Sequence, residues 1–218
     1  MISRLLIISG PTATGKTGLA VKIARKLGGE LVSADSRQIY RGMDIGTGKD
    51  HPKTTPVHLI DLVPPSSPFS VAQYRPLAVS KIIDIQNRGL LPIVVGGSGQ
   101  YIESILSPQP TFSIPPKPLL RRLLNPLPVS YLQYIYRLLD GQSFRLLNNS
   151  DRHNPHRLIR KIEIKLSRQP NKPALLPPGC CLHISLTASN RFLIDRIDAR
   201  IKQRLDSGLL SEIDRLLA

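Results

Sequence analysis

The sequence lacks tryptophan and contains little cysteine. Its two cysteines, Cys180 and Cys181, are adjacent, and adjacent cysteines rarely satisfy disulfide geometry. We therefore expect two reduced core residues on a strand, as in cytoplasmic proteins. No apolar run approaches the ~20 residues of a membrane span, and the run near Met1 is too short for a signal peptide. These absences exclude a disulfide scaffold and predict a soluble, cytoplasmic protein with no membrane partner.

Acidic residues are also scarce. The chain has 15 Asp and Glu against 30 Lys and Arg, which gives a net charge of +15 and a pI near 10.3. The segment from Lys117 to Lys172 alone carries twelve basic and three acidic residues. Such an excess predicts a polyanionic partner, first of all nucleic acid. A soluble basic protein without such a partner is the alternative.

Residues 9–18 contain the spacing G-x-x-x-x-G-K-[ST] between an apolar run and a helical pattern, the context in which this spacing forms a phosphate-binding loop. Backbone N–H groups and the helix N-terminus would hold di- or triphosphate oxygens. Lys16 would neutralise the terminal phosphate, and Thr17 would bind Mg²⁺. A glycine turn that binds nothing is the alternative. The predicted diphosphate- or nucleotide-binding residues are Gly10, Pro11, Thr12, Ala13, Thr14, Gly15, Lys16 and Thr17.

Two carboxylates follow predicted strands. Asp35 comes after residues 30–33, and Asp61 comes after residues 57–60. Because loops at the carboxyl ends of parallel strands face the ligand crevice, Asp35 should point toward the phosphates and serve a metal or a proton. A helix-capping role is its alternative. Asp61 competes with Asp35 for the metal-side position found in P-loop proteins.

Further elements predict the rest of an α/β fold. A capping box at Ser70 opens a helix that ends near residue 88, and an apolar strand over 90–95 leads into a second glycine-rich loop at 96–99. That loop grips a ligand or lets helix and strand pack tightly. The basic loop over 41–56 either closes over substrate or is a surface connection. A last strand over 182–186 precedes a long amphipathic helix.

The fold class that we predict is a P-loop NTPase-like α/β fold, with a three-layer parallel sheet, helices on both faces and a small, mostly helical insertion. The insertion covers 107–150 and is rich in proline. The core comprises 1–106 and 151–218. Asn154 is an N-cap with Pro155 at the first helical position, so a helix should run from there to about Arg168. Its basic faces predict a track for a phosphate backbone.

Several tracts, in this order, resemble tRNA dimethylallyltransferases, the IPP transferase family. They are the phosphate loop, Asp35–Thr47, His58–Asp61, Gly96–Ser98 and Asn154–Arg160. The tract over 34–47 is long and idiosyncratic, which makes the likeness specific. The resemblance covers residues 4–106 closely and 151–218 more loosely.

The resemblance implies transfer of a dimethylallyl group from dimethylallyl diphosphate to N6 of the adenine 3′-adjacent to the tRNA anticodon. It implies Mg²⁺ held by Thr17, catalytic roles for Lys16, Thr17 and the general base Asp35, and a monomer whose insertion faces the anticodon stem-loop. Ser98 stands where the family usually has threonine. The residues that would contact tRNA are Asp35, Ser36, Arg37, Gln38, Ser98, His156, Arg157, Leu158, Ile159 and Arg160.

Three other hypotheses for the function remain open. A P-loop kinase or NTPase acting on a small molecule would bind ATP through the same loop. A prenyltransferase acting on free adenine nucleotides would need less positive charge. A truncated, non-catalytic RNA-binding homologue is the third, because the sequence ends at Ala218, before further helices that the resemblance leads us to expect.

Overall fold

The computed structural model describes residues 3–49, 52, 54–107, 111, 114–167 and 179–217. The chain divides into two compact units. The first comprises Met1–Pro108 and Ala174–Ala218, and the second comprises Gln109–Pro173.

A five-stranded parallel sheet forms the centre of the first unit. In β1, Leu6 pairs with Ile93 of β4 on one side and with Leu182 of β5 on the other. The strand order is β3-β2-β4-β1-β5, as expected for an α/β fold with crossover connections. The strands are β1 (Ser3–Ser9), β2 (Gly29–Ser33), β3 (Val57–His58), β4 (Leu91–Gly96) and β5 (Gly179–Ser185).

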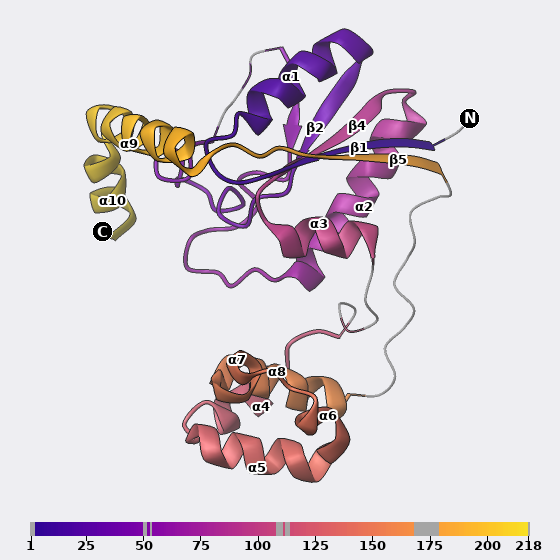
Figure 1. The fold of residues 1–218 in the computed structure, drawn as a ribbon, viewed down its shortest axis with the longest axis vertical. Coiled ribbons are helices and arrows are strands. Elements are labelled where there is room, and N and C mark those ends of the chain that lie inside the picture. Colours follow the sequence, from indigo (N-terminus) through magenta and orange to yellow (C-terminus); the bar gives the residue numbers. More distant parts are fainter. Residues whose placement is uncertain are drawn as a thin grey trace. The chain divides into compact units, whose positions relative to one another are not determined.

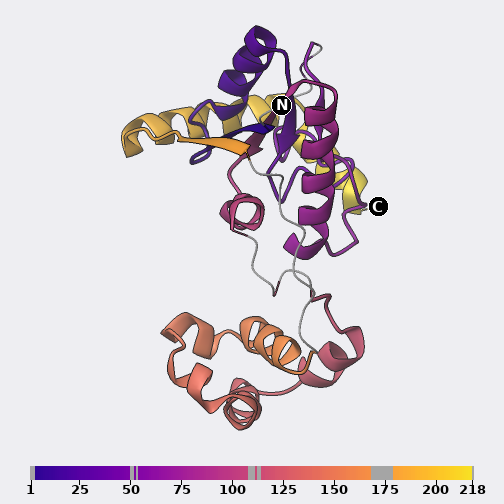
Figure 2. The ribbon, with the colours of Figure 1, turned by 90° about the vertical axis from the view of Figure 1, so that its right-hand side faces the viewer.

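Helices cover both faces of this sheet (Figures 1 and 2). Side chains alternate along β1, so Leu6 and Ile8 pack against α1 (Lys16–Leu27), while Ile7 packs with α2 (Val71–Asn87) and α3 (Gly99–Leu106). Because both faces are buried, the strand reads as a continuous apolar run. The predicted three-layer architecture is confirmed.

Two helices follow β5. Ser189 caps α9 (Asn190–Asp206) by accepting a hydrogen bond from the Phe192 backbone N–H, and Gly208, at φ 93°, makes the turn into α10 (Leu209–Leu217). Among the helices of the described residues, none combines the length and apolar character that crossing a membrane requires.

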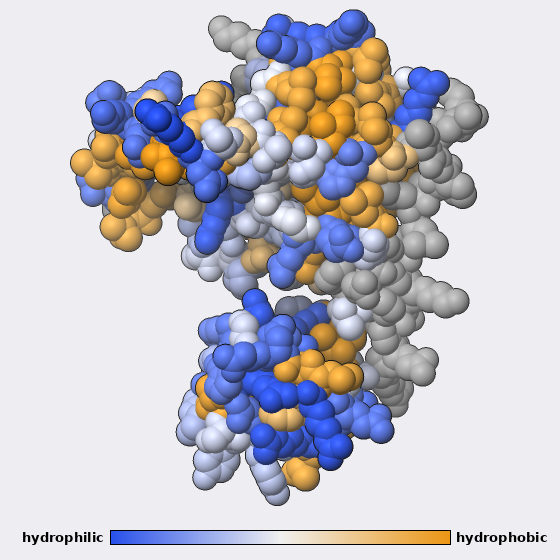
Figure 3. Space-filling model, viewed as in Figure 1, coloured by the Kyte–Doolittle hydropathy of each residue, from blue (hydrophilic) through white to orange (hydrophobic). Residues whose placement is uncertain are grey.

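The second unit has a hydrophobic core of its own. Its helices are α4 (Pro118–Leu124), α5 (Val129–Leu139), α6 (Gly141–Arg145), α7 (Asn149–His153) and α8 (Pro155–Lys165). In that core, Leu158 and Ile162 of α8 pack with Leu132 of α5. The insertion therefore does not end at residue 150 as predicted, because α8 buries its apolar side among α4–α6. Polar residues dominate the face of this unit seen in Figure 3.

A buried carboxylate holds this unit together. Glu163 of α8 is fully buried and accepts hydrogen bonds from the Lys117 backbone N–H, from Arg121 and from Arg160. Burial raises the pKa of this carboxyl, but the Arg121, Lys117 and Arg160 donors outweigh burial and lower the pKa overall. The N-terminus of α4 is thereby fixed to α8.

Three details differ from the sequence predictions. Strand β3 ends at His58 rather than at residue 60, because Leu59 and Asp61 adopt positive φ values of 63° and 56°. Cys181 lies on a strand as expected but is exposed, since β5 is an edge strand. Helix α8 ends at Lys165, and the predicted end at Arg168, like the burial of Cys180, lies outside the described residues.

A carboxylate on β2 makes stability sensitive to acid. Glu30 is 8% exposed, and both its oxygens pair with Arg88 at 2.7 Å. His58 Nε2 lies 2.7 Å from Oε2. Hydrogen bonds from Arg88 lower the pKa of Glu30 to about 2 against the opposing effect of burial, and His58 adds to the lowering.

We expect the free energy of unfolding to fall as the pH drops from about 4.5 toward about 2, because the unfolded chain binds the Glu30 proton first. Glu30→Gln should lose about 2 kcal/mol at pH 7, where the paired carboxylate contributes fully. It should also flatten the acid limb. Urea unfolding between pH 2 and 7 measures both effects, and an unaltered acid limb in the variant would contradict this assignment.

Candidate functional site

The loop after β1 has the geometry of an anion site. Gly10 has a φ of 143°, and a Cβ there would lie 2.4 Å from the Leu186 carbonyl oxygen, so only glycine fits. Gly15, at φ 86°, is the N-cap of α1 and provides no side-chain cap. The first turn of α1 contains no acidic residue. An exposed positive helix end of this kind attracts phosphate oxygens.

Lys16 and Thr17 occupy the first turn of α1. Lys16 Nζ donates a 2.6 Å hydrogen bond to the Pro11 carbonyl, as Thr14 Oγ1 does at 2.9 Å. Burial lowers the pKa of Lys16, the Asp35 carboxylate opposes this, and Arg200 lowers it further. These electrostatic effects show that one carboxylate and two cations share the site.

The loop after β2 carries Asp35. Its Oδ1 accepts a 2.9 Å hydrogen bond from the Arg37 backbone N–H. Ser98 joins this loop to the loop after β4, because its Oγ accepts from the Ser36 N–H at 2.8 Å and its own N–H donates to the Ala34 carbonyl at 3.1 Å. Ser98 thus supports the Asp35 loop and does not line the cavity described next.

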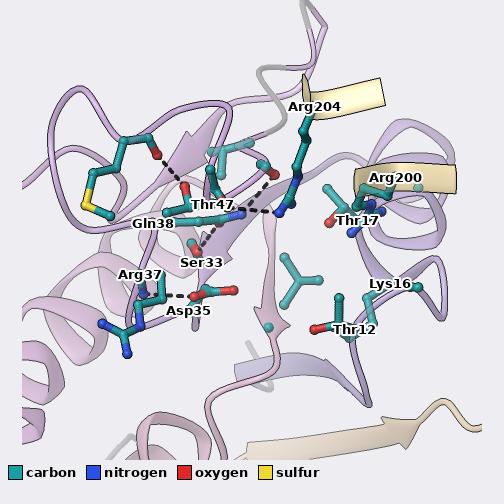
Figure 4. A pocket seen from close by; sticks show the side chains of 18 of the residues that line it. Thr12, Lys16, Thr17, Ser33, Asp35, Arg37, Gln38, Thr47, Arg200 and Arg204 are labelled. Carbon is teal, nitrogen blue, oxygen red and sulfur yellow. Dashed lines mark hydrogen bonds between the residues drawn. The ribbon is translucent and has the colours of Figure 1, made fainter. Parts of the chain in front are cut away.

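A cavity of about 720 Å³ lies at the carboxyl ends of β1, β2 and β4. Figure 4 shows Lys16 and Thr17 of the phosphate loop on one side, with Asp35 and Gln38 across from them. Parallel sheets commonly place ligands at this edge. Of the predicted residues, the structure brings together on its walls Thr12, Ala13, Gly15, Lys16, Thr17, Asp35, Arg37 and Gln38.

Sequence reasoning missed the arginines of α9. Arg196, Arg200 and Arg204 line the cavity from the chain's last third, and Figure 4 shows Arg200 and Arg204 entering it. Their spacing of four residues puts them on one side of a helix. That spacing was the available signal, but it resembled an ordinary charged face of an amphipathic helix.

Both glycine-containing loops can now be assigned. Met43, Gly46, Thr47 and Gly48 line the cavity, so the described part of the 41–56 loop belongs to the site. Gly96 serves close packing, because a Cβ there would lie 2.1 Å from the Ala34 carbonyl oxygen. Gly96 also lines the cavity, so the second loop packs tightly at the wall of the site.

Asp61 does not compete with Asp35 for the cavity. Its carboxylate pairs with the buried Lys49 ammonium, which also bonds Asp44 and the Tyr40 carbonyl. Burial lowers the pKa of Lys49, but the hydrogen bonds that it donates to the carboxylates of Asp44 and Asp61 outweigh burial, so the pKa is raised overall. Asp61 thus stabilises the 40–49 loop through its ion pair with Lys49.

The residues predicted from 156–160 belong to the second unit. Leu158 and Ile159 are core side chains, 0% and 2% exposed, and cannot present themselves to RNA. Arg160 donates to the carbonyls of Thr111 and Ile114 and to Glu163, so it holds its own unit together. His156 and Arg157 are exposed.

The side chains of the cavity suit a metal ion that is held mainly by substrate phosphates. Among residues 3–49, 52, 54–107, 111, 114–167 and 179–217, no group of three His, Cys, Asp or Glu side chains could hold an ion. Mg²⁺, however, typically retains water and binds through substrate phosphates with few protein ligands. The Thr17 hydroxyl beside the phosphate loop fits such an ion, and a metal cage built from protein side chains is not expected here.

The combined features can neutralise a departing diphosphate and remove a proton in one cavity. The loop amides, Lys16 and the α9 arginines supply positive charge, and Asp35 supplies the carboxylate. Reactions that release diphosphate from carbon need this combination when the nucleophile must lose a proton.

Comparison with known proteins reveals close relatives. The sequence model of the family described as IPP transferase matches residues 38–218, and that described as isopentenyl transferase matches 3–61. The chain is 42% identical to tRNA dimethylallyltransferase 1 of Geotalea daltonii, over 99% of this chain and 70% of the relative. It is 41% identical to tRNA dimethylallyltransferase 1 of Geotalea uraniireducens, over 99% and 71%.

Solved structures of similar proteins also superimpose on this chain. The full-length tRNA isopentenylpyrophosphate transferase from Bacillus halodurans superimposes with a TM-score of 0.67 at 35% identity, over 99% of this chain and 70% of that one. A eukaryotic dimethylallyltransferase acting on tRNA superimposes with a TM-score of 0.83 at 25% identity, over 99% and 56%.

Lys16→Met should weaken binding of inorganic pyrophosphate by about 10- to 100-fold, the loss expected for one charged hydrogen bond. Isothermal titration calorimetry measures it. Lys22→Met, an exposed lysine on the same helix, is the matched control and should bind like the unaltered protein. Equal affinities for both variants would remove Lys16 from the anion site.

Proposed function

The chain belongs to the IPP transferase family, and from this premise we propose that it transfers a dimethylallyl group from dimethylallyl diphosphate to tRNA. The acceptor in this proposal is N6 of the adenine 3′-adjacent to the anticodon. One observation carries it: the phosphate loop with Lys16 and the carboxylate of Asp35 face the same cavity (Figure 4).

The leaving diphosphate would lie against the phosphate loop. Backbone N–H groups at the start of α1, Lys16 and the guanidinium of Arg200 supply positive charge where negative charge develops as the C–O bond of the donor breaks. Preorganised charges of this kind provide much of an enzyme's rate acceleration. Allylic diphosphates ionise readily once the leaving group is neutralised.

Asp35 is the base in this proposal. The adenine N6 bonds to the allylic carbon, the diphosphate departs with the electrons of the C–O bond, and the N6 proton moves to the Asp35 carboxylate. A single positioned base contributes typically 10²- to 10⁴-fold. The Arg37 N–H, bound to Oδ1, orients the carboxylate and leaves its second oxygen for the proton.

Mg²⁺ is the cofactor that we propose, with Thr17 as its protein ligand. When bound with the diphosphate, it would neutralise part of the charge on the leaving group. The chain's own contribution is the hydroxyl of Thr17 next to Lys16 at the start of α1.

The helical second unit is the proposed contact for the anticodon stem-loop. Its described part carries ten basic and three acidic residues, and the three acids, Asp140, Asp151 and Glu163, are all paired with basic side chains. The remaining positive charge favours a phosphate backbone. Extruding a base costs a few kcal/mol, which such contacts would offset.

Gln38 and Asp35 would contact the extruded adenine in the cavity. We propose a cytoplasmic monomer.

The family match favours this function over a small-molecule kinase, which would need the phosphate loop but no second unit rich in basic residues. Incubation with radiolabelled dimethylallyl diphosphate, Mg²⁺ and unmodified tRNA, followed by nucleoside analysis, tests the proposal. We expect label on adenosine adjacent to the anticodon. Phosphate release from ATP without labelled RNA would favour the kinase, and tRNA binding without label would favour a non-catalytic homologue.

Asp35→Asn should lower prenyl transfer by at least ~10²-fold, the lower limit for a positioned base. The amide oxygen still accepts the Arg37 N–H, so the fold and donor affinity should be kept. Single-turnover kinetics and donor titration separate the two effects. Unchanged turnover would remove Asp35 from the mechanism.

Arg157→Ala should weaken tRNA binding and reduce the slope of log affinity against log salt by about one. Asp151 keeps Lys161 as its partner, so the second unit should stay folded. Lys81→Ala removes an equal charge from the surface of α2 and is the control. An unaltered slope for Arg157→Ala would place α8 away from the RNA. Arg160→Ala, in contrast, should lower the unit's stability.

A further inference from the structure

We infer that Glu212 of α10 is a positioning residue that holds the 43–48 loop in place over the cavity. This inference rests on the proposed function for its kinetic readout. Glu212 is 3% exposed, although it lies on a short helix whose other described side chains are mostly exposed. A buried carboxylate at such a position requires compensating partners.

Those partners are three consecutive backbone N–H groups. Asp44 and Ile45 donate to Oε2 at 2.8 and 2.7 Å, and Gly46 donates to Oε1 at 2.9 Å. A loop that turns successive N–H groups toward one point forms an anion-binding nest. Here the anion is a side chain from 166–168 residues away in the sequence. Burial raises the pKa of Glu212, but the Gly46, Ile45 and Asp44 donors outweigh it and lower the pKa.

The same loop is held from two further directions. Arg204 of α9 donates to the Gly46 carbonyl at 2.9 Å, and Gln38 Nε2 donates to the Gly48 carbonyl at 3.2 Å. Gly48 has a φ of 61°, which favours glycine, and a Cβ there would lie 2.3 Å from an Arg204 nitrogen, so the guanidinium would have to shift. Glu212, Arg204 and Gln38 therefore hold the loop at three places, and all three residues line the cavity.

Gln38 connects this loop to the end of β2, just before Asp35. Its Oε1 accepts from Ser33 Oγ at 3.0 Å, and it lines the cavity three residues after Asp35. If Glu212 released the 44–46 amides, the loop would relax and Gln38 would lose the Gly48 carbonyl. Small displacements of positioning groups can cost up to ~10²-fold in rate. The phosphate loop has no bond to Glu212 in the described part of the chain, so donor binding should be preserved.

Glu212→Gln is the decisive variant. Its carboxamide keeps the size of the side chain but presents an NH₂ group where a backbone N–H must be accepted. We expect the amides of 44–46 to lose at least ~10-fold of their hydrogen-exchange protection. We also expect kcat to fall by at least ~10-fold, with the Kd for dimethylallyl diphosphate nearly unchanged. Asp214→Asn, with the same charge change on the exposed side of α10, should alter none of these.

Arg204→Met tests the hold on the loop separately, by hydrogen exchange alone, because Arg204 also lines the cavity. It should speed exchange of the same loop amides, whether or not Glu212→Gln folds. Faster exchange with unchanged kcat in Glu212→Gln would overturn the positioning role, and unchanged exchange in both variants would overturn the hold on the loop. If the unaltered protein transfers no prenyl group, the proposed function fails, while the exchange measurements still decide whether Glu212 holds the loop.

Discussion

The site depends on how closely the strand ends and their loops approach one another. Gly10 lies against the Leu186 carbonyl, and Gly96 lies against the Ala34 carbonyl, at distances that no Cβ would allow. The first contact joins the phosphate loop after β1 to the segment after β5, and the second joins the loop after β4 to the carboxylate loop after β2. Ser98 then fixes the carboxylate loop with two hydrogen bonds. Glycine at two positions is thus a precondition for a cavity where cations and Asp35 face each other.

Basic and acidic side chains have different places in this structure. Lys16, Arg196, Arg200 and Arg204 line the same cavity as the carboxylate of Asp35, so the cavity carries more positive than negative charge. Elsewhere the acids serve structure: Glu30, Glu163 and Glu212 are buried and accept hydrogen bonds from charged side chains or backbone N–H groups. Within the described residues, every buried acid has hydrogen-bond partners, as buried polar groups usually do.

Features that depend on neighbouring residues could be predicted from the sequence, and features that depend on long-range contacts could not. The helix start after Gly15, the capping box at Ser70 and the N-cap at Asn154 are set by neighbouring residues, and the structure confirms each. The arginines of α9 and Glu212 reach the cavity only through tertiary folding, so no local pattern revealed them. The extent of the second unit was misjudged for the same reason. Leu158 and Ile159 were assigned to RNA contact by position in a motif, which does not distinguish the buried side of a helix from the exposed side.

The pairing of β1 with β5 has a consequence for biosynthesis. Ser3–Ser9 occupies an inner position of the sheet only once Gly179–Ser185 is available, and the helical unit lies between them in the sequence. The helical unit, which has its own core, is therefore synthesised before β5, the strand that completes the sheet. Contacts of such large sequence separation slow folding and leave apolar strand edges open to wrong partners. The nascent chain should consequently need protection by chaperones until its last strand emerges.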